Sequence, residues 1–406
     1  MRTVVFVAPF SFDTTLKFVD AAAEHPGVRF VLVSQDPPER FPAPLRRRLA
    51  GHWQVGDALA VDQLTAAVKA IGEHLGPVHR LLGTLEHLQV PLARVRERLE
   101  IEGMGTTAAE NFRDKARMKD VLRAAGLPCA RHKLLADAAD AWAFAGEVGY
   151  PIVVKPPAGA GAKATFSVED AAALGEVLRR HPPHPTQPML AEEFIQGEEH
   201  SFDGVSIDGE LVWHSLTHYS PAPLDAVRNP WIQWCVLLPR EVDDPRYDDI
   251  RREAASALAV LGMVTGVSHL EWFRRGDGTI AISEVGARPG GAQISKLISY
   301  AHDFSFYRAW ARVMIDGEFS PPERKYAAGA AYLRGQGHGR VRSVHGLDRA
   351  QRDLGPLVVE AHLPRPGQLP SSSYEGDGFV ILRHRDTAVV RDALKKLITT
   401  VRVELG

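Results

Sequence analysis

The segment from Ser268 to Gly291 constrains the fold and the chemistry of this chain more than any other stretch. It reads SHLEWFRRGDGTIAISEVGARPGG, with the turn signal Asp277-Gly278 at its centre. Apolar residues alternate with polar ones on both sides of that signal, and this pattern predicts a β-hairpin. Each predicted strand carries one acid, Glu271 or Glu284, and Arg288 follows the second of them.

The register of this hairpin decides whether the two acids can act together. If Glu271 lies opposite Ile282, Glu284 is its diagonal neighbour on the same face, about 7–8 Å away. A slip of one residue would place the acids on opposite faces. Two carboxylates on one face suit Mg²⁺ (or Mn²⁺), a hard cation that takes oxygen ligands and bridges phosphates. The alternative is two exposed hairpin acids and an ordinary surface arginine.

Composition excludes several classes of protein. The chain has 406 residues, 45% of them hydrophobic and 24% charged, which is ordinary for a globular protein of two to four domains. The net charge of −2 gives no basic field for nucleic acid or an anionic membrane. Cys129 and Cys235 lie far apart, so a disulfide framework or thiolate zinc site is not expected, and a reducing cytoplasm is. The first residues predict a strand rather than a signal peptide, and we expect no membrane span.

Strands and helices alternate in the first part of the chain, which predicts a parallel α/β sheet. The expected strands are residues 3–8, 28–33 and 78–82, and the expected helices are 14–23, 64–75 and 88–99. The loop after the first strand is APFSFD rather than GxGxxG, so no nicotinamide dinucleotide site is expected there. Glycines at 103–105 and the Pro321-Pro322 pair divide the chain into predicted domains 1–105, 106–320 and 321–406.

The rest of the chain gives a mixed pattern of helices and strands. A helix is expected near 108–125, and another from Ser167, where Ser167 to Asp170 resembles a capping box. The other expected helices are 137–148, 246–261, 303–316 and 387–399, and the expected strands are 129–135, 151–155, 189–195, 200–207, 210–215, 327–333, 357–363, 379–384 and 401–405.

Three lysines are candidates for binding phosphates. Lys155 ends an apolar strand just before the loop PPAGAGAKA, which contains Lys163. A lysine facing a glycine-containing loop presents a cation and free backbone N–H groups, although no Walker A motif is present. Lys115 lies in the charge run NFRDKARMK. For each of them the alternative is a lysine exposed to solvent.

The run EEFIQGEE at residues 192–199 suits a nucleoside. Strand backbone from Glu192 through Glu193 to Ile195 can offer a carbonyl and an N–H to the edge of an adenine. Glu199 can accept hydrogen bonds from ribose hydroxyls. The alternative is an exposed strand and turn.

The order of these motifs along the chain resembles the ATP-grasp superfamily, in particular its biotin carboxylase-like and purine-pathway carboxylase-like branch and the L-amino acid ligases. The resemblance covers most of the chain and depends on GTLEHLQ (83–89), FRDK (112–115), AGLP (125–128), YPIVVKP (150–156), EEFIQGEE (192–199) and EVGARPGG (284–291). It implies an α/β ATP-grasp fold with a Rossmann-like pre-ATP-grasp domain, an ATP-grasp body whose mobile lid spans about 128–198, and a C-terminal α+β domain.

The resemblance also implies a role for each candidate residue. Lys115 and Lys155 would contact the ATP phosphates, with the 157–164 loop and Lys163 folded over them. Glu192, Glu193 and Ile195 would hold the adenine and Glu199 the ribose, while Glu271 and Glu284 would bind Mg²⁺. Arg288 would stabilise the transferred phosphoryl group or the substrate carboxylate. One departure is Gly286, where many relatives have an asparagine as a further metal ligand.

The acceptor region is expected to include Tyr219 and His269, because strand alternation places His269 on the face of Glu271. The leading hypothesis is an ATP-dependent carboxylate–amine ligase that acts through an acyl phosphate on small molecules, in a monomer or a homodimer such as relatives often form. The alternatives are a bicarbonate-activating carboxylase and a non-catalytic nucleotide-binding protein on the same fold.

Overall fold

The N-terminal part of the chain folds around a four-stranded parallel sheet. The computed structural model describes residues 1–159, 164–371 and 373–406. The strand order is β3-β2-β1-β4, and every pairing is parallel, as predicted. The elements are β1 (Arg2–Val7), α1 (Asp13–Ala23), β2 (Val28–Ser34), α2 (Ala43–Arg46), β3 (Gly51–Gln54), α3 (Val61–Leu75), β4 (Val78–Leu82) and α4 (Gln89–Arg98).

Both faces of this sheet are buried because apolar side chains point to each side in turn. Val4 and Phe6 belong to one hydrophobic cluster with α1 residues, and Val5 and Val7 belong to another with α3 residues. A strand buried on both faces is expected to be continuously apolar, as β1 is from Val4 to Val7.

The helix expected near 108–125 is two helices, α5 (Thr106–Arg113) and α6 (Lys115–Ala124). Asp114 separates them and caps α6, since its carboxylate accepts hydrogen bonds from the N–H groups of Ala116 and Arg117. The break places Lys115 at the first position of α6 rather than on a solvent-exposed helix face.

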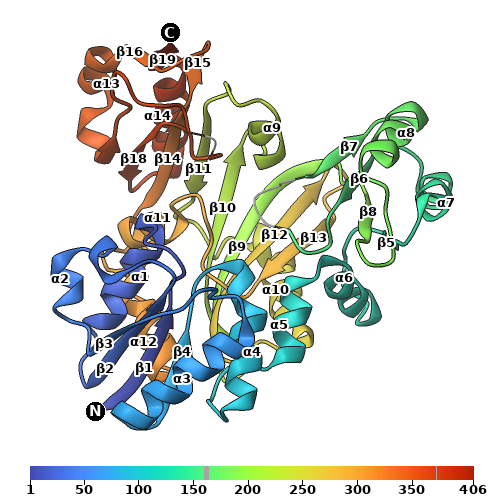
Figure 1. Cartoon of the computed structure of the whole chain (residues 1–406). Coiled ribbons are helices and arrows are strands. Elements are labelled where there is room, and N and C mark those ends of the chain that lie inside the picture. Colours follow the sequence, from blue (N-terminus) through green and yellow to red (C-terminus); the bar gives the residue numbers. More distant parts are fainter. Residues whose placement is uncertain (160–163, 372) are drawn as a thin grey trace.

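A small sheet projects from the side of the molecule, with the order β5-β8-β6-β7 (Figure 1). Its strands are β5 (His132–Leu135), β6 (Ile152–Lys155), β7 (Phe166–Val168) and β8 (Met189–Glu193). Helix α7 (Ala138–Val148) connects β5 to β6, and helix α8 (Ala171–Arg180) connects β7 to β8. The expected helix start at Ser167 is wrong: that residue lies in β7, and Asp170 caps α8 through the N–H of Ala173. Residues 160–163 lie outside the described part of the chain.

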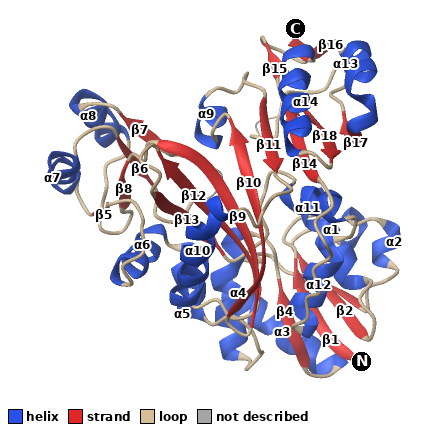
Figure 2. Cartoon of the chain, turned by 180° about the vertical axis from the view of Figure 1, so that it is seen from behind, coloured by secondary structure: helices blue, strands red, loops and turns tan. Residues whose placement is uncertain are grey.

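An eight-stranded antiparallel sheet forms the centre of the molecule (Figure 2), in the order β13-β12-β9-β10-β11-β14-β18-β17. Its strands are β9 (Gly197–Ile207), β10 (Glu210–Ser220), β11 (Trp234–Leu238), β12 (Gly266–Arg275), β13 (Ile280–Gly286), β14 (Ala327–Leu333), β17 (Val358–His362) and β18 (Gly378–His384). Strands on both sides of the proposed boundary at residue 321 therefore share one sheet. The three domain ranges remain a prediction.

Helices and a second small sheet complete the described structure. These elements are α9 (Pro223–Arg228), α10 (Asp248–Leu261), α11 (Ile294–His302), α12 (Phe306–Asp316), α13 (Leu347–Leu354), α14 (Thr387–Thr400), β15 (Gly335–Gln336), β16 (Val341–His345) and β19 (Arg402–Leu405), with 3₁₀ turns at Pro38–Arg40, Glu86–Leu88, Pro245–Tyr247 and Gly355–Leu357.

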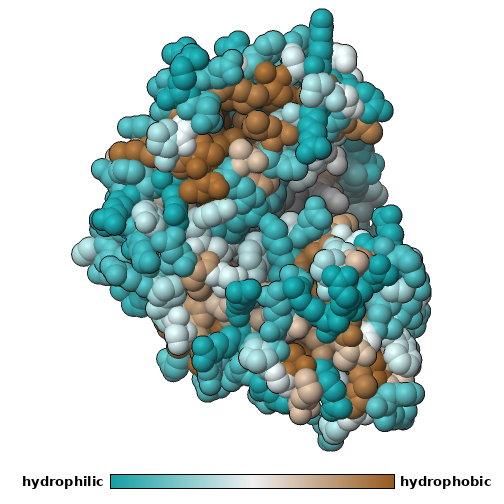
Figure 3. All heavy atoms as spheres, turned by 90° about the vertical axis from the view of Figure 1, so that its left-hand side faces the viewer, coloured by the Kyte–Doolittle hydropathy of each residue, from teal (hydrophilic) through white to brown (hydrophobic). Residues whose placement is uncertain are grey.

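One face of the molecule is largely hydrophilic, with the largest group of hydrophobic side chains in the upper part of the view and smaller groups in the lower part (Figure 3). No helix among the described residues has both the length and the hydropathy needed to cross a bilayer.

Candidate functional site

The two hairpin acids lie directly opposite each other on β12 and β13. Glu271 pairs with Glu284, and the next residue, Trp272, pairs with Ile282. The register with Glu271 opposite Ile282 is therefore wrong by two residues along β13, and a bulge at Ser283 accounts for one of them. The shift brings the acids closer than a diagonal pair, since directly opposite Cβ atoms are about 4.5–5.5 Å apart.

One cavity of about 800 Å³ brings together nearly all the candidate residues. These come from the start of α6, the small projecting sheet and the segment after it, the central sheet and the loop after β13. The candidates that line it are Lys115, Lys155, Glu192, Glu193, Ile195, Glu199, Tyr219, His269, Glu271, Glu284 and Arg288. Lys163 lies outside the described residues.

Lys115 is buried, Lys155 is partly buried and both are paired, which contradicts the interpretation of exposed surface lysines. Lys115 is 5% exposed, and its Nζ lies 2.9 Å from Oε1 of Glu284. Lys155 Nζ lies 2.8 Å from Oε2 of Glu192, and Lys119 Nζ lies 3.1 Å from the other oxygen of that carboxylate. Burial alone would raise the pKa of Glu192, but the two lysines outweigh it and bring the pKa to about 2.

Glu199 has the opposite environment. Burial, together with the charge of Glu271, raises its pKa to about 8. No side-chain hydrogen bond or ion pair to its carboxylate is found within the described ranges. Such a carboxylate is available to accept hydrogen bonds from a ligand.

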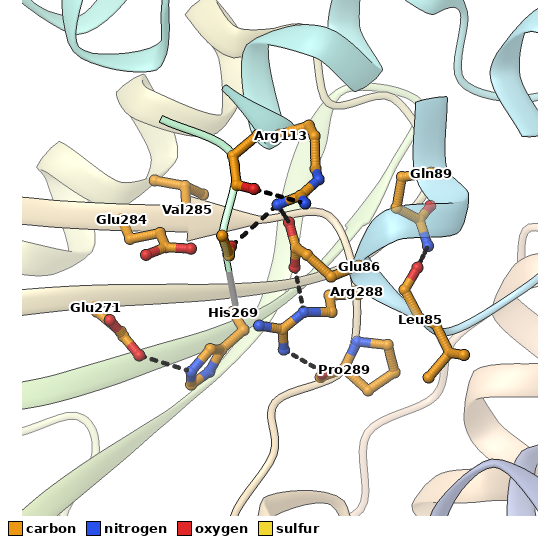
Figure 4. Close-up of polar contacts among 12 residues, drawn as sticks. Leu85, Glu86, Gln89, Arg113, His269, Glu271, Glu284, Val285, Arg288 and Pro289 are labelled. Carbon is orange, nitrogen blue, oxygen red and sulfur yellow. Dashed lines mark hydrogen bonds and ion pairs between the residues drawn. The ribbon is translucent and has the colours of Figure 1, made fainter. Parts of the chain in front are cut away.

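Arg288 is positioned by a residue that the sequence did not reveal. Its Nε donates to Oε2 of Glu86, and its Nη1 donates to the carbonyl oxygen of Pro289 at 2.9 Å (Figure 4). Arg113 Nη1 lies 3.9 Å from the other oxygen of Glu86. Burial alone would lower the pKa of Arg288, but Glu86 raises it, so the guanidinium stays charged.

Gly286 lies beside the same carboxylate. A Cβ atom at residue 286 would stand 3.3 Å from Oε2 of Glu86. Glu86 therefore lies next to the position at which relatives carry an asparagine. Its motif, GTLEHLQ, contributed to the resemblance, but no sequence spacing connects residue 86 to residue 288.

His269 lies between two acids. Its Nδ1 is 2.8 Å from Oδ1 of Asp203, and its Nε2 is 3.7 Å from Oε1 of Glu271 (Figure 4). Burial alone would lower the pKa of His269, but Asp203 and Glu271 raise it to about 9. Asp203 on β9 lies opposite His269 on β12, and this pairing brings the acid into the site.

The loop after Arg288 bends sharply around the cavity. Ala292 and Gln293 have φ angles of 48° and 55°, in the left-handed region that residues with a Cβ rarely adopt. The N–H of Ala292 donates to the hydroxyl of Tyr374 at 3.2 Å, and the hydroxyl of Tyr332 donates to the carbonyl oxygen of Ala292 at 2.5 Å. Tyr374 comes from the C-terminal part of the chain, so its presence in the site was not predicted.

This chain is similar to known proteins in sequence and in fold. The model of the family described as "Carbamoyl-phosphate synthase L chain, ATP binding domain" matches residues 114–201. An L-arginine-specific L-amino acid ligase of Bacillus subtilis is 28% identical over 285 residues, which cover 67% of this chain. The match spans 66% of that relative, slightly less than two thirds of its length.

Two solved structures share the fold over nearly the whole chain. An L-amino acid ligase from Bacillus licheniformis superposes with a TM-score of 0.77 at 20% identity, covering 100% of this chain and 99% of that one. The N5-carboxyaminoimidazole ribonucleotide synthetase from Thermotoga maritima superposes with a TM-score of 0.71 at 16% identity, covering 100% of both chains. Both are similar to this chain in fold, as the motif order predicted.

Proposed function

We propose that this chain is an ATP-dependent ligase of the ATP-grasp superfamily that joins a small carboxylate to an amine and releases ADP and phosphate. One observation carries the proposal: Glu271 and Glu284 face each other in a cavity that also contains Lys115, Lys155 and Arg288. Some relatives are L-amino acid ligases, so amino acids are the substrate class to test first.

The nucleotide would lie between the small projecting sheet and the central sheet. Lys115 and Lys155 would contact its phosphates, the backbone from Glu192 to Ile195 its adenine, and Glu199 its ribose. We propose residues 128–198 as a lid that closes over the nucleotide and excludes water, which would otherwise hydrolyse a reactive intermediate.

The two acids fit a divalent cation. Carboxylate oxygens are ligands that Mg²⁺ and Mn²⁺ prefer, and Mg²⁺ is usually bound by one or two carboxylates together with substrate phosphates and water. Glu271 and Glu284 would hold the ion, and Lys115 now neutralises Glu284. When bound, the cation would neutralise charge on the phosphates, while Gly286 contributes no side-chain ligand.

The proposed chemistry has two steps. An oxygen of the substrate carboxylate attacks the γ-phosphorus, the bond to the β-phosphate oxygen breaks, and ADP leaves. The lone pair of the amine then attacks the acyl carbon, phosphate leaves with the bonding electrons, and the amine loses a proton. The first step is needed because a carboxylate has a poor leaving group, and the protein contributes mainly positioning and charge stabilisation.

Residues around the hairpin would orient the carboxylate. The guanidinium of Arg288 can hold a carboxylate or the transferred phosphoryl group with two parallel hydrogen bonds. His269, kept protonated by Asp203, adds a second positive group beside Glu271. Tyr219 lines the same cavity and would contact the substrate.

The decisive experiment measures ADP and phosphate release with ATP, Mg²⁺ and a panel of amino-acid pairs, dicarboxylates and bicarbonate. We expect release that depends on an amine, and mass spectrometry should detect the amide product. Glu284→Gln should reduce turnover at least 10³-fold because it removes a carboxylate at the proposed cation site. Asp277→Asn is a matched control, since Asp277 is an exposed acid at the tip of the same hairpin.

Each outcome has a separate meaning. Release that requires bicarbonate rather than an amine would indicate a carboxylase, and nucleotide binding without turnover would indicate a binding protein. Unaltered turnover in a folded Glu284→Gln variant would contradict the assignment of the acids.

A further inference from the structure

The cavity extends from its nucleotide end, around Lys115, Lys155 and Glu271, to Lys17 at the other end. Lys17 of α1 and Tyr307 of α12 both line it, together with Gln293 of the loop after β13. Helices α1 and α12 pack against each other, as Figure 1 shows. We call this part of the cavity, around Lys17, Gln293 and Tyr307, the acceptor end.

Lys17 lacks a carboxylate of its own. It contacts the side chain of Lys296, and its Nζ lies 5.8 Å from the centre of the Tyr307 ring. Lys296 is already paired, since its Nζ lies 2.5 Å from Oε1 of Glu360. Within the described ranges no carboxylate lies at ion-pair distance from Lys17.

Lys17 and Lys296 are therefore both influenced by one partly buried acid, Glu360. The other acid that acts on Lys17 is Asp13, which is exposed in the first turn of α1. Burial, followed by the contact with Lys296, lowers the pKa of Lys17 to about 8, so this lysine is still mainly protonated at neutral pH. Lys17 is only partly buried, so water can solvate its charge, and an anionic ligand that displaces this water would become its partner.

Different charged groups have the main influence on Lys17 and on Lys155. The charged groups that act on Lys17 are Lys296, Glu360 and Asp13. The groups that act on Lys155 are Glu192, Glu284 and Glu271. An anion at Lys17 would therefore be a different group from the nucleotide phosphates.

We propose that Lys17, supported by Lys296, is a specificity-determining residue that binds an anionic group, a carboxylate or a phosphate, on the amine substrate. The inference depends on the proposed ligase function, because it assigns the second substrate to the acceptor end. The amine itself would lie toward Arg288, and its anionic group would lie over the Tyr307 side of the cavity.

Matched pairs of amines test this proposal. An amino acid is compared with its amide, and ethanolamine phosphate with ethanolamine, so the two arms distinguish a carboxylate from a phosphate. Lys17→Met should raise the KM for the charged member about 10- to 100-fold, as loss of a charge-assisted hydrogen bond predicts, with little change in kcat. The KM for the neutral member should not change, and Lys17→Arg should retain most of the preference.

Two further measurements keep the outcome clear. Lys69→Met is a control, since Lys69 is an exposed lysine on α3. Calorimetry of charged and neutral amines with wild type and Lys17→Met needs no turnover, so it tests the subsite even if ligation fails. The subsite is supported if the wild type prefers the amine that carries an anionic group and Lys17→Met loses this preference. Equal effects of the substitution on both amines, or no preference in the wild type, would overturn it.

Discussion

The two ends of the cavity differ in how their charges are balanced. At the nucleotide end, Glu192 contacts both Lys119 and Lys155, and Glu284 contacts Lys115. At the acceptor end, Lys17 has no carboxylate at ion-pair distance among the described residues, and its side chain contacts another cation, Lys296. This difference indicates that the nucleotide end is preorganised by ion pairs that also stabilise the fold. The acceptor end, in contrast, needs its ligand to complete the charge balance.

The largest expected effect is at the nucleotide end, in the variant Glu192→Gln. This change leaves two lysines without their shared carboxylate, and Lys119 is completely buried. Breaking a buried ion pair from one side typically costs about 3–5 kcal/mol. We expect a loss of that size in the free energy of unfolding, measured by urea denaturation at neutral pH.

The neighbouring residue is the control for that variant. Glu193 pairs with Arg131 and Arg275 at a partly exposed position, so Glu193→Gln should cost about 0–1 kcal/mol. Equal losses in the two variants would show that the nucleotide end does not depend on its buried pairs.

The second prediction concerns acid pH. The pKa of Glu192 is about 2 in the folded protein, against an ordinary value of 4.5. The stability that this shift provides is therefore present above pH 4.5 and is lost as the pH falls toward about 2. Urea denaturation of the wild type across this window should show a steeper loss of stability than Glu192→Gln does. Parallel pH profiles would contradict the assigned ion pairs.

The third prediction concerns the loop between the two ends. A Cβ atom at Gly291 would stand 2.2 Å from the hydroxyl oxygen of Tyr374. Gly291→Ala should therefore cost about 1–3 kcal/mol through overpacking. It should also lower kcat several-fold, because the shifted loop carries Arg288. Thermal unfolding and ADP release measure the two effects.

A control and a rescue make that prediction specific. A Cβ atom at Gly276 meets nothing within 4 Å, so Gly276→Ala should have little effect. Adding Tyr374→Phe to Gly291→Ala removes the closest atom and should restore part of the activity. If the double variant is no better than Gly291→Ala, another contact limits the loop.

The nucleotide end was largely predictable because its residues lie in short motifs with a fixed order along the chain. Lys115, Lys155, Glu199 and Glu271 were all selected from sequence, and all line the cavity. Their functional roles remain predictions. The strand β14 (Ala327–Leu333) was predicted with the correct bounds because an uninterrupted run of small and apolar residues covers its whole length.

What the sequence did not reveal depends on contacts between distant segments. Glu86 meets Arg288 across 202 positions, and Tyr374 meets Ala292 across 82. The bulge at Ser283 has no turn residue to signal it, so the alternation alone gave the wrong register. Asp114 was hidden within a run of charges, although its spacing to Ala116 and Arg117 is that of a helix cap.

The smallest expected effect is at the acceptor end, in the stability of Lys17→Met. This variant removes a cation that touches Lys296 and has no acid at ion-pair distance, so it leaves no buried carboxylate unpaired. The free energy of unfolding should change by less than about 1 kcal/mol, in either direction, because the lost contact with Tyr307 opposes the relief of repulsion. Urea denaturation measured beside Glu192→Gln makes the comparison direct. A loss as large as that of Glu192→Gln would mean that Lys17 is a structural partner at its end of the cavity, and the contrast between the two ends would not hold.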